Sequence, residues 1–193
     1  MRVFFIDNFD SFTYNLVDEF EKRNCEVLVY GNNADIKMID SAIKKFKPNL
    51  IVICSGTGAP KDAGNSMGVI RNHYEKIPVF GVGLGHLCII EVFGGNVDKS
   101  IEIVSGKPSK ISHDGKTIFK KLESPFKAGR YYTLAGVEIP YCLEVSARSE
   151  SDVVMGVRHK EHFVEGIQFD PSSILTPLGY LIIENLIKEI NKK

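Results

Sequence analysis

Short apolar runs alternate with amphipathic segments over the first half of the chain. Four of the runs are typical of buried parallel strands, at residues 2–6, 26–31, 49–54 and 78–82. Apolar residues at helical spacing predict four helices between and after them, at residues 11–24, 36–47, 65–76 and 86–95. This alternation predicts an α/β fold with a doubly wound, mostly parallel sheet and right-handed crossovers.

After Gly95 the pattern changes to shorter strands that are separated by turn residues, at residues 101–115, 143–152, 153–160 and 164–170. We expect these segments to form a small antiparallel addition to the sheet. A last amphipathic helix is predicted over 179–193, where terminal lysines suit the negative end of the helix dipole. Because the sequence has no repeat, low-complexity segment or linker, we expect a single domain over residues 1–193.

The charge balance limits the classes of partner. The chain carries 24 Lys and Arg residues against 24 Asp and Glu residues, and neither sign forms a long block. Nucleic-acid and membrane-surface proteins normally carry a basic excess or patch, so we expect neither partner. The longest apolar stretch, 77–95, is interrupted by His86, Glu91 and five glycines. A buried strand followed by a buried helix explains it better than a membrane span.

Four cysteines lie far apart in the sequence, at Cys25, Cys54, Cys88 and Cys142. No CxxC pair is present, and a strand-like run begins at residue 2 where a secretory protein would have its signal peptide. We therefore expect reduced, unpaired thiols in the core of a cytoplasmic protein.

Three loops are expected to meet at one edge of the sheet, because ligands of doubly wound folds bind at the carboxyl ends of the strands. The loops span 7–11, 55–60 and 81–87. The first opens a helix and carries hydroxyls at Ser11 and Thr13, which is typical of an anion site. Asp7 and Asp10 would repel a phosphate there, so we expect Ser11 to cap the helix instead.

The third loop contains the sequence GVGLGHL, from Gly81 to Leu87. As a dinucleotide motif it fails, because His86 stands where the third glycine belongs and because the motif follows the fourth predicted strand, not the first. It fits better a strand–turn–helix elbow, which projects its tip residue beside free amides. The tip is Gly83, which relaxes the turn but carries no nucleophile.

Longer motifs reveal a relationship. The segments IDNFDSFTYNL, KDAGNS, IPVFGVGLGH, FGGNV, VMGVRHKEHFVEGIQF and SILT occur in one particular order and spacing. In these the chain resembles, over essentially its whole length, the class I (triad) glutamine amidotransferases. It is most similar to the glutaminase subunits of anthranilate synthase and aminodeoxychorismate synthase. The resemblance implies a flavodoxin-like fold and no metal or cofactor.

The catalytic triad of that family is substituted here. The family elbow is G-V-C-L-G-H-Q, and its cysteine attacks the glutamine side-chain amide to give a thioester and ammonia; the corresponding residue is Gly83. The family motif F-H-P-E-S corresponds to FDPSS, so the activating histidine is Asp170 and the orienting glutamate is Ser172. The resemblance therefore implies loss of glutamine hydrolysis.

The positions that would hold glutamine are also altered. The family loop S-P-G-P-G-T-P corresponds to CSGTGAP, which keeps Gly56 and Gly58 but not the two inner prolines. The amides of Gly56 and Leu84 remain candidates for an oxyanion hole. The glutamine after Gly-His in the family is Leu87 here, and R-Y-H-S-L corresponds to RYYTL, which places Tyr132 and Thr133 at the site.

Few side chains could replace the missing residues of the catalytic triad. Cys88 lies five residues past the elbow tip, an offset that turns it about 140° away on a helix, so we expect a core thiol. A carboxylate at Asp170 can accept a proton but faces no thiol. We expect the remaining histidines to lie at the surface, at His73, His113, His159 and His162. The HxxH spacing of the last two is a weak metal motif outside a helix, so no metal site is predicted.

Three functions stay open. In the family the subunit docks on a chorismate-using synthase, around the site mouth and its DNFDSF loop, which is intact here at Asn8, Asp10, Ser11 and Phe12. The first hypothesis is a non-hydrolysing subunit that docks on such a synthase, which then uses free ammonia. The second is a small-molecule sensor that reuses a pocket lined by Gly83, Tyr132 and Asp170. The third is a glutaminase with an unusual nucleophile.

Overall fold

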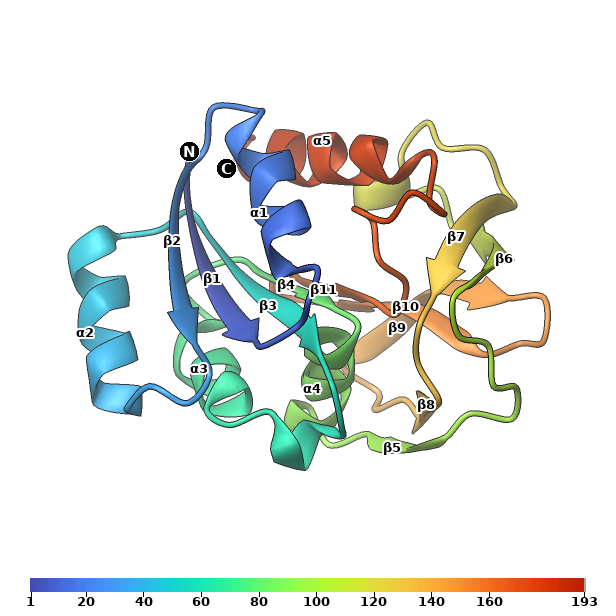
Figure 1. Ribbon diagram of the computed structural model, residues 1–193, viewed down its shortest axis with the longest axis horizontal. Coiled ribbons are helices and arrows are strands. Elements are labelled where there is room, and N and C mark those ends of the chain that lie inside the picture. The colour runs from blue at the N-terminus through green and yellow to red at the C-terminus, as the bar shows by residue number, and fades with distance from the viewer. Residues whose placement is uncertain (193) are drawn as a thin grey trace.

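The first strand, β1 (Arg2–Asn8), buries both of its faces, as its continuous apolar run predicts. Successive side chains alternate between two hydrophobic clusters. Val3 and Phe5 lie in the cluster that contains α1 and α5, whereas Phe4 and Ile6 lie in the cluster that contains α2, α3 and α4. The strand is therefore in the middle layer of a three-layer α/β/α arrangement (Figure 1).

The computed structural model describes residues 1–192, and within this range the main sheet has nine strands in the order β2-β1-β3-β4-β11-β10-β9-β6-β7. The other strands of this sheet are β2 (Glu26–Gly31), β3 (Leu50–Gly56), β4 (Val79–Val82), β6 (Lys107–His113), β7 (Phe126–Arg130), β9 (Leu143–Ser149), β10 (Val154–His159) and β11 (Val164–Ile167). A separate antiparallel pair consists of β5 (Asn96–Lys99) and β8 (Leu134–Glu138).

The sheet changes direction at β11. The strands β2, β1, β3, β4 and β11 are parallel to one another, and β10, β9, β6 and β7 continue the sheet as antiparallel neighbours. The predicted mostly parallel α/β sheet with an antiparallel addition is confirmed. The structure adds β5, β7 and β8, which the sequence did not predict, and shortens the predicted strand over 101–115 to β6.

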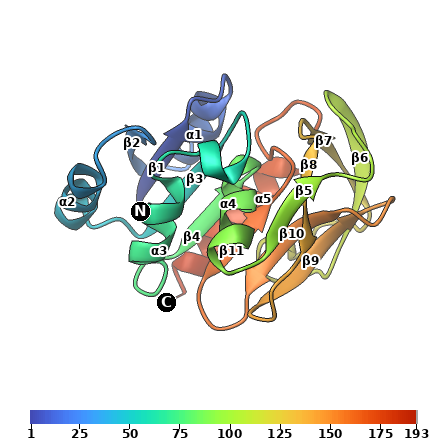
Figure 2. The same cartoon turned by 90° about the horizontal axis from the view of Figure 1, so that it is seen from below.

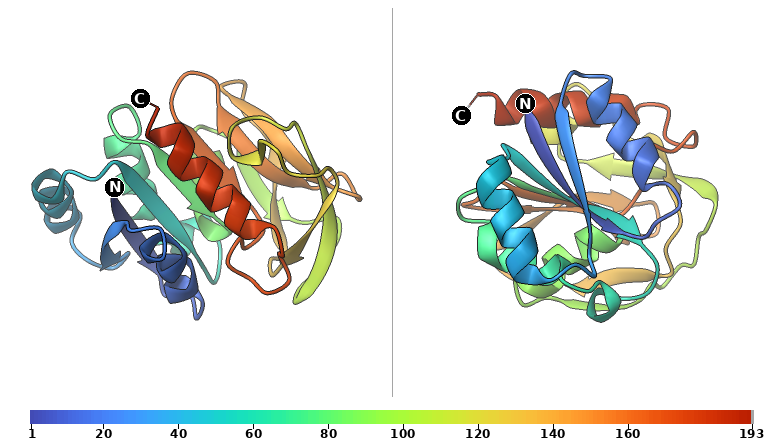
Figure 3. Two further views of the ribbon diagram at one scale, coloured as in Figure 1. Left: turned by 90° about the horizontal axis from the view of Figure 1, so that it is seen from above. Right: turned by 60° about the vertical axis from the view of Figure 1, so that its left-hand side comes forward.

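Helices cover both faces of the sheet. On one face lie α1 (Thr13–Glu21) and α5 (Gly179–Ile190), and on the other lie α2 (Ile36–Phe46), α3 (Ser66–His73) and α4 (Leu84–Val92). Figure 3 (left) shows the first pair in front of the sheet, and Figure 2 shows α3 and α4 on the opposite side. Two short 3₁₀ turns complete the described elements, η1 (Pro60–Asp62) and η2 (Thr117–Phe119).

The predicted helices all form, most with shorter ends, whereas α4 begins two residues before its predicted start. The clearest difference is at α1, whose N-cap residue is Phe12, so the expectation that Ser11 caps this helix is wrong. The Phe12 amide donates to Asp10 Oδ1 (2.7 Å), because a carboxylate is a stronger acceptor for a turn amide than a hydroxyl. Lys193, the predicted end of the last helix, lies outside the described residues. Over residues 1–192 no helix is both long and apolar enough to cross a membrane.

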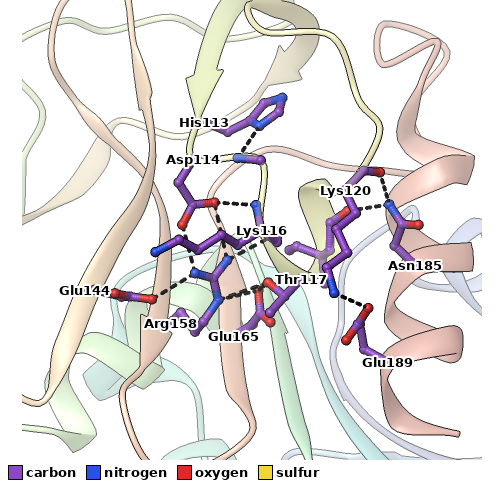
Figure 4. Close-up of polar contacts among 12 residues, drawn as sticks. His113, Asp114, Lys116, Thr117, Lys120, Glu144, Arg158, Glu165, Asn185 and Glu189 are labelled. Carbon is purple, nitrogen blue, oxygen red and sulfur yellow. Dashed lines mark hydrogen bonds and ion pairs between the residues drawn. The ribbon is translucent and has the colours of Figure 1, made fainter. Parts of the chain in front are cut away.

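A buried ionic network joins the antiparallel strands to one another (Figure 4). The Arg158 side chain on β10 is only 9% exposed, and its Nη1 lies 2.8 Å from both Asp114 Oδ2 and Glu144 Oε1. Its Nε lies 3.4 Å from Glu165 Oε2 on β11 and donates to Thr117 Oγ1 (2.9 Å). Thr117 Oγ1 in turn donates to Glu165 Oε2 (2.8 Å). One guanidinium therefore links two neighbouring strands and the η2 turn.

Burial changes the acid–base properties of this network. Burial of Glu165 raises the pKa of its carboxyl to about 7, against the opposing field of Arg158. For Arg158 burial favours the neutral form, but the hydrogen bond to Asp114 and the field of Glu165 outweigh it and raise the guanidinium pKa. Close by, Asn185 on α5 donates to the carbonyl of Lys120 (2.7 Å), which fixes the helix against η2 (Figure 4).

Candidate functional site

The carboxyl ends of β1 and β3 meet at a cavity of about 540 Å³. The segment between β7 and β8 forms its opposite wall, and the turn after β11 contributes one further residue. Most of the predicted site residues line it: Asp10, Ser11, Phe12, Gly56, Gly58, Tyr132, Thr133 and Asp170. The structure brings together residues from four distant segments. Two of the three loops expected at the carboxyl edge, 7–11 and 55–60, line the cavity, whereas no residue of 81–87 does.

The elbow forms at the end of β4. Gly83 lies between β4 and α4 with φ 57° and ψ −109°, a backbone region that favours glycine. Its amide donates to the carbonyl of Ile167 on β11 (2.8 Å), and the Leu87 amide donates to the Gly83 carbonyl (3.2 Å). The predicted strand–turn–helix geometry is therefore present, with its tip held between β11 and the first turn of α4.

The Tyr132 ring covers the elbow tip. A Cβ atom built on Gly83 would lie 2.6 Å from both Tyr132 Cε2 and Tyr132 Oη, and 2.7 Å from Ser55 Oγ. These separations are below any normal carbon contact, so the present packing leaves no room for a side chain at position 83. Gly83 was expected to line the pocket, but Tyr132 lines it in its place.

The Tyr132 hydroxyl also uses the candidate oxyanion-hole amides. The Gly56 amide donates to Tyr132 Oη (3.0 Å), and the nearby Leu84 amide lowers the pKa of the same hydroxyl. Tyr132 Oη donates to the Gly56 carbonyl (2.9 Å) and forms a further short hydrogen bond with Ser55 Oγ. Burial raises the pKa of Tyr132, with the hydrogen bond to Ser55 as the largest opposing effect.

The glycine loop after β3 is held by an acid in place of prolines. The Ala59 amide donates to Asp62 Oδ2 (3.0 Å), and Gly58 adopts φ +85°, where a Cβ atom would lie 3.0 Å from the same carboxylate oxygen. A larger residue at position 58 would therefore need both a strained backbone and a displaced Asp62. This local bond gives the loop an anchor that its sequence, without inner prolines, did not indicate.

Asp170 and Ser172 are partners of each other. Ser172 donates to Asp170 Oδ1 through its amide (2.8 Å) and through its hydroxyl (2.7 Å). Burial raises the pKa of the Asp170 carboxyl, while the bonds from Ser172 oppose this shift. The pair forms a closed turn at the cavity wall and contains neither an imidazole nor a thiol.

Two predicted residues of α4 lie away from the cavity. Leu87 is fully buried, so the expected contact of its side chain with a substrate is not available. Cys88 is also fully buried, which confirms the predicted core thiol, and burial raises its pKa to about 12. All four cysteines are free; Cys142, however, is only half-buried and not a full member of the core.

The loop after β1 has a buried base and an exposed tip. Asn8 is buried, with Nδ2 donating to the Cys54 carbonyl (2.7 Å) and Oδ1 accepting from Asn32 (2.8 Å) and from Ser66 (2.6 Å). Its side chain therefore supports the loop from inside and is not free for the partner contact expected of it. At the tip, the Phe12 ring lies 6.4 Å from that of Tyr131.

Some site residues were missed by the sequence interpretation. Phe9 is 60% exposed with φ 60°, and it lines the cavity together with Ser55 and Tyr131. An aromatic residue between two polar loop positions was the available indication for Phe9. Ser55 and Tyr131 adjoin predicted positions, but which side chains of a loop face a cavity depends on backbone angles that a single sequence does not give.

One expectation about the histidines is wrong. His159 is buried, not at the surface, and its ring lies 4.7 Å from that of Phe93 and 5.0 Å from that of His162. Burial lowers its pKa. Burial follows from its position at the end of the fully buried strand β10. Among residues 1–192, no three His, Cys, Asp or Glu side chains are grouped so that they could hold a metal ion.

The family described as Glutamine amidotransferase class-I matches this chain over residues 4–190. The chain belongs to this family. Among curated relatives of the amidotransferase, "Anthranilate synthase component 2" of Methanocaldococcus jannaschii is 41% identical over 97% of this chain and 96% of its own length. "Aminodeoxychorismate/anthranilate synthase component 2" of Bacillus subtilis is 40% identical over 99% and 98%.

Other relatives are longer. The chain spans about half of the "Multifunctional tryptophan biosynthesis protein" of Pichia angusta, to which it is 44% identical over 96% of its own length. Among solved structures, a glutamine amidotransferase from Thermotoga maritima has a TM-score of 0.80 at 12% identity and covers 100% of this chain, with 99% of its own length matched. This last likeness supports the amidotransferase fold.

Proposed function

We propose that this amidotransferase is a subunit of a chorismate-using synthase and that it acts by docking on the synthase without hydrolysing glutamine. The observation that carries the proposal is the elbow tip: Gly83 supplies no nucleophile, and Tyr132 lies over it. Residues 1–193 would form one amidotransferase domain of a cytoplasmic complex.

The chemistry supports the loss of hydrolysis. Class I enzymes of this kind need a thiolate, a base that takes its proton and a group that orients the base. The corresponding positions hold Gly83, Asp170 and Ser172, and the last two are bonded to each other. Cys88 is no substitute, because its thiol is fully buried and its pKa is about 12.

Docking is supported by the relatives and by the exposed tip of the first loop. The matched proteins of similar length are named as component 2 of anthranilate or aminodeoxychorismate synthase. Phe12 is 53% exposed at the cavity mouth, next to Asp10 and Ser11. Exposed aromatic side chains are enriched at protein interfaces. We propose these three residues as partner contacts, with Asn8 holding the loop beneath them.

The test mixes the purified chain with the chorismate-using synthase of the same genome. Product formation is measured from glutamine and from ammonium, and complex formation by co-elution. We expect no product from glutamine, product from ammonium, and co-elution that Phe12→Ala weakens. Tyr141→Ala is the matched control, because Tyr141 is 91% exposed on a different turn.

Other outcomes would overturn the proposal. Glutamine turnover that depends on this chain would restore the glutaminase hypothesis. A chain that neither co-elutes with the synthase nor alters its ammonium rate would favour the small-molecule sensor, for which the cavity of about 540 Å³ is large enough.

A further inference from the structure

A candidate oxyanion-hole amide already has a ligand. In a working acyl-transfer site, two backbone amides point at the position where the carbonyl oxygen of the substrate gains charge. Here the Gly56 amide donates to Tyr132 Oη, and the Leu84 amide lies near the same oxygen. The oxygen that the Gly56 amide binds belongs to the chain itself.

The hydrogen-bonding capacity of this hydroxyl is fully used. A phenol has one proton and two acceptor positions. The Gly56 amide takes one acceptor position, the Ser55 hydroxyl can take the other, and the proton goes to the Gly56 carbonyl (2.9 Å). Since burial raises the pKa of Tyr132, the group stays a neutral phenol at physiological pH. The Tyr132 hydroxyl is therefore satisfied within the protein, without a bound molecule.

The ring of Tyr132 blocks the site in addition to its hydroxyl. The Tyr132 ring edge lies where the first atom of any side chain at position 83 would be, 2.6 Å from an ideal Cβ. A substrate carbonyl that approached the elbow would need the same space. Loss of the nucleophile and occupation of the hole are thus two separate changes at one site.

We infer that Tyr132 is a built-in ligand of the elbow, which takes the place of a substrate carbonyl at the Gly56 amide and covers the tip at Gly83. The inference deepens the proposed function and rests on it for its biological meaning. Its physical content is that the amides beside the elbow and the elbow tip are shielded by one side chain. That content can be measured on the isolated protein.

The first experiment keeps the natural elbow. Hydrogen exchange of the Gly56 and Leu84 amides is measured in the wild type, in Tyr132→Phe and in the control Tyr131→Phe. Tyr131 lines the same cavity, but its hydroxyl is bonded to Ser173 Oγ (2.7 Å). We expect both amides to exchange about tenfold faster in Tyr132→Phe and unchanged in the control. Unchanged exchange in Tyr132→Phe would overturn the inference.

The second experiment places a thiol at the elbow tip, where the Tyr132 ring must shift to admit it. Gly83→Cys is compared with the double variants G83C/Y132A and G83C/Y131A, and alkylation at position 83 by iodoacetamide is followed by mass spectrometry under native conditions. We expect alkylation about tenfold faster in G83C/Y132A than in the other two. Equal rates in all three would mean that Tyr132 does not shield the tip.

These results separate the inference from the proposed function. Neither measurement uses the synthase, so failure of the chain to dock leaves both readouts intact. Conversely, glutamine turnover by the wild type would contradict the proposed function, and unchanged amide exchange in Tyr132→Phe would contradict the shielding alone. If G83C does not fold, the exchange experiment decides the inference by itself.

Discussion

The buried Arg158–Glu165 pair predicts a pH-dependent loss of stability when the arginine is replaced. In the substitution Arg158→Met the volume of the side chain is nearly kept, but Glu165, whose side chain is 2% exposed, loses its cationic neighbour. Breaking a buried ion pair from one side typically costs about 3–5 kcal/mol. Asp114 and Glu144 are partly exposed, so water can replace the arginine there.

The direction of the change in stability with pH follows from proton binding by Glu165. The carboxyl of Glu165 has its pKa raised to about 7 in the folded wild type, against 4.5 ordinarily. Between these values the folded state holds a proton that the unfolded chain has released, so wild-type stability falls as pH rises and becomes level above pH 7. Without Arg158 the pKa rises further. The variant then continues to lose up to about 1.36 kcal/mol for each pH unit until the pH reaches its higher pKa, so its stability gap to the wild type widens above pH 7.

The assay is urea unfolding at several pH values from 6 to 9 for wild type, R158M and the double variant R158M/E165Q. The double variant removes the titrating group, so its gap to the wild type should not widen above pH 7. Asp114 does not interfere, because its pKa is lowered below an ordinary value of 3.8 and lies far from this range. A gap between R158M and wild type that is constant from pH 7 to pH 9 would refute the reasoning.

Three further predictions concern buried polar and reactive groups. Leu87→Gln, which restores the residue of the related family, should lower the free energy of unfolding by about 2–4 kcal/mol, since the amide would be buried without partners; a thermal melt within 1 °C of wild type would contradict this. Asn8→Ala should cost about 2–4 kcal/mol by removing three buried hydrogen bonds, whereas the exposed Ser11→Ala should change stability by less than about 0.5 kcal/mol; chemical denaturation of both tests the contrast. Cys88 should be alkylated by iodoacetamide only after unfolding, and native modification at pH 7.5 would show that α4 opens locally.

Much of the fold followed from periodicity. The parallel half has continuous apolar strands and amphipathic helices, and each was predicted within a few residues. The strands β5, β7 and β8 were missed because they are short and carry glycine or charge at several positions, as in FKAGR at Phe126–Arg130. Such strands are set by their neighbours in the sheet more than by their own sequence.

The sequence predicted which residues lie near the site but not which way their side chains point. The sequence indicated that Gly83 stands at an elbow and that Tyr132 lies nearby, and both are so. What it did not indicate is that Tyr132 lies over the tip and binds the Gly56 amide, because this depends on where the segment after β7 crosses the end of β3. Leu87 and Asn8 were expected to contact a ligand or a partner. Leu87 lies in the first turn of α4 and Asn8 at the end of β1, and both side chains are buried in the interior.

The place of β11 in the sheet has a consequence for the nascent chain. This strand is synthesised late, yet it is inserted between β4 and β10, near the middle of the sheet. Until β11 leaves the ribosome, β4 presents an edge of unpaired backbone N–H and C=O groups beside apolar side chains, and the antiparallel strands have no ladder that joins them to the parallel ones. A chain that ends before residue 164 therefore lacks the strand that pairs the two halves of the sheet. We expect such a fragment to expose unpaired strand edges and to aggregate.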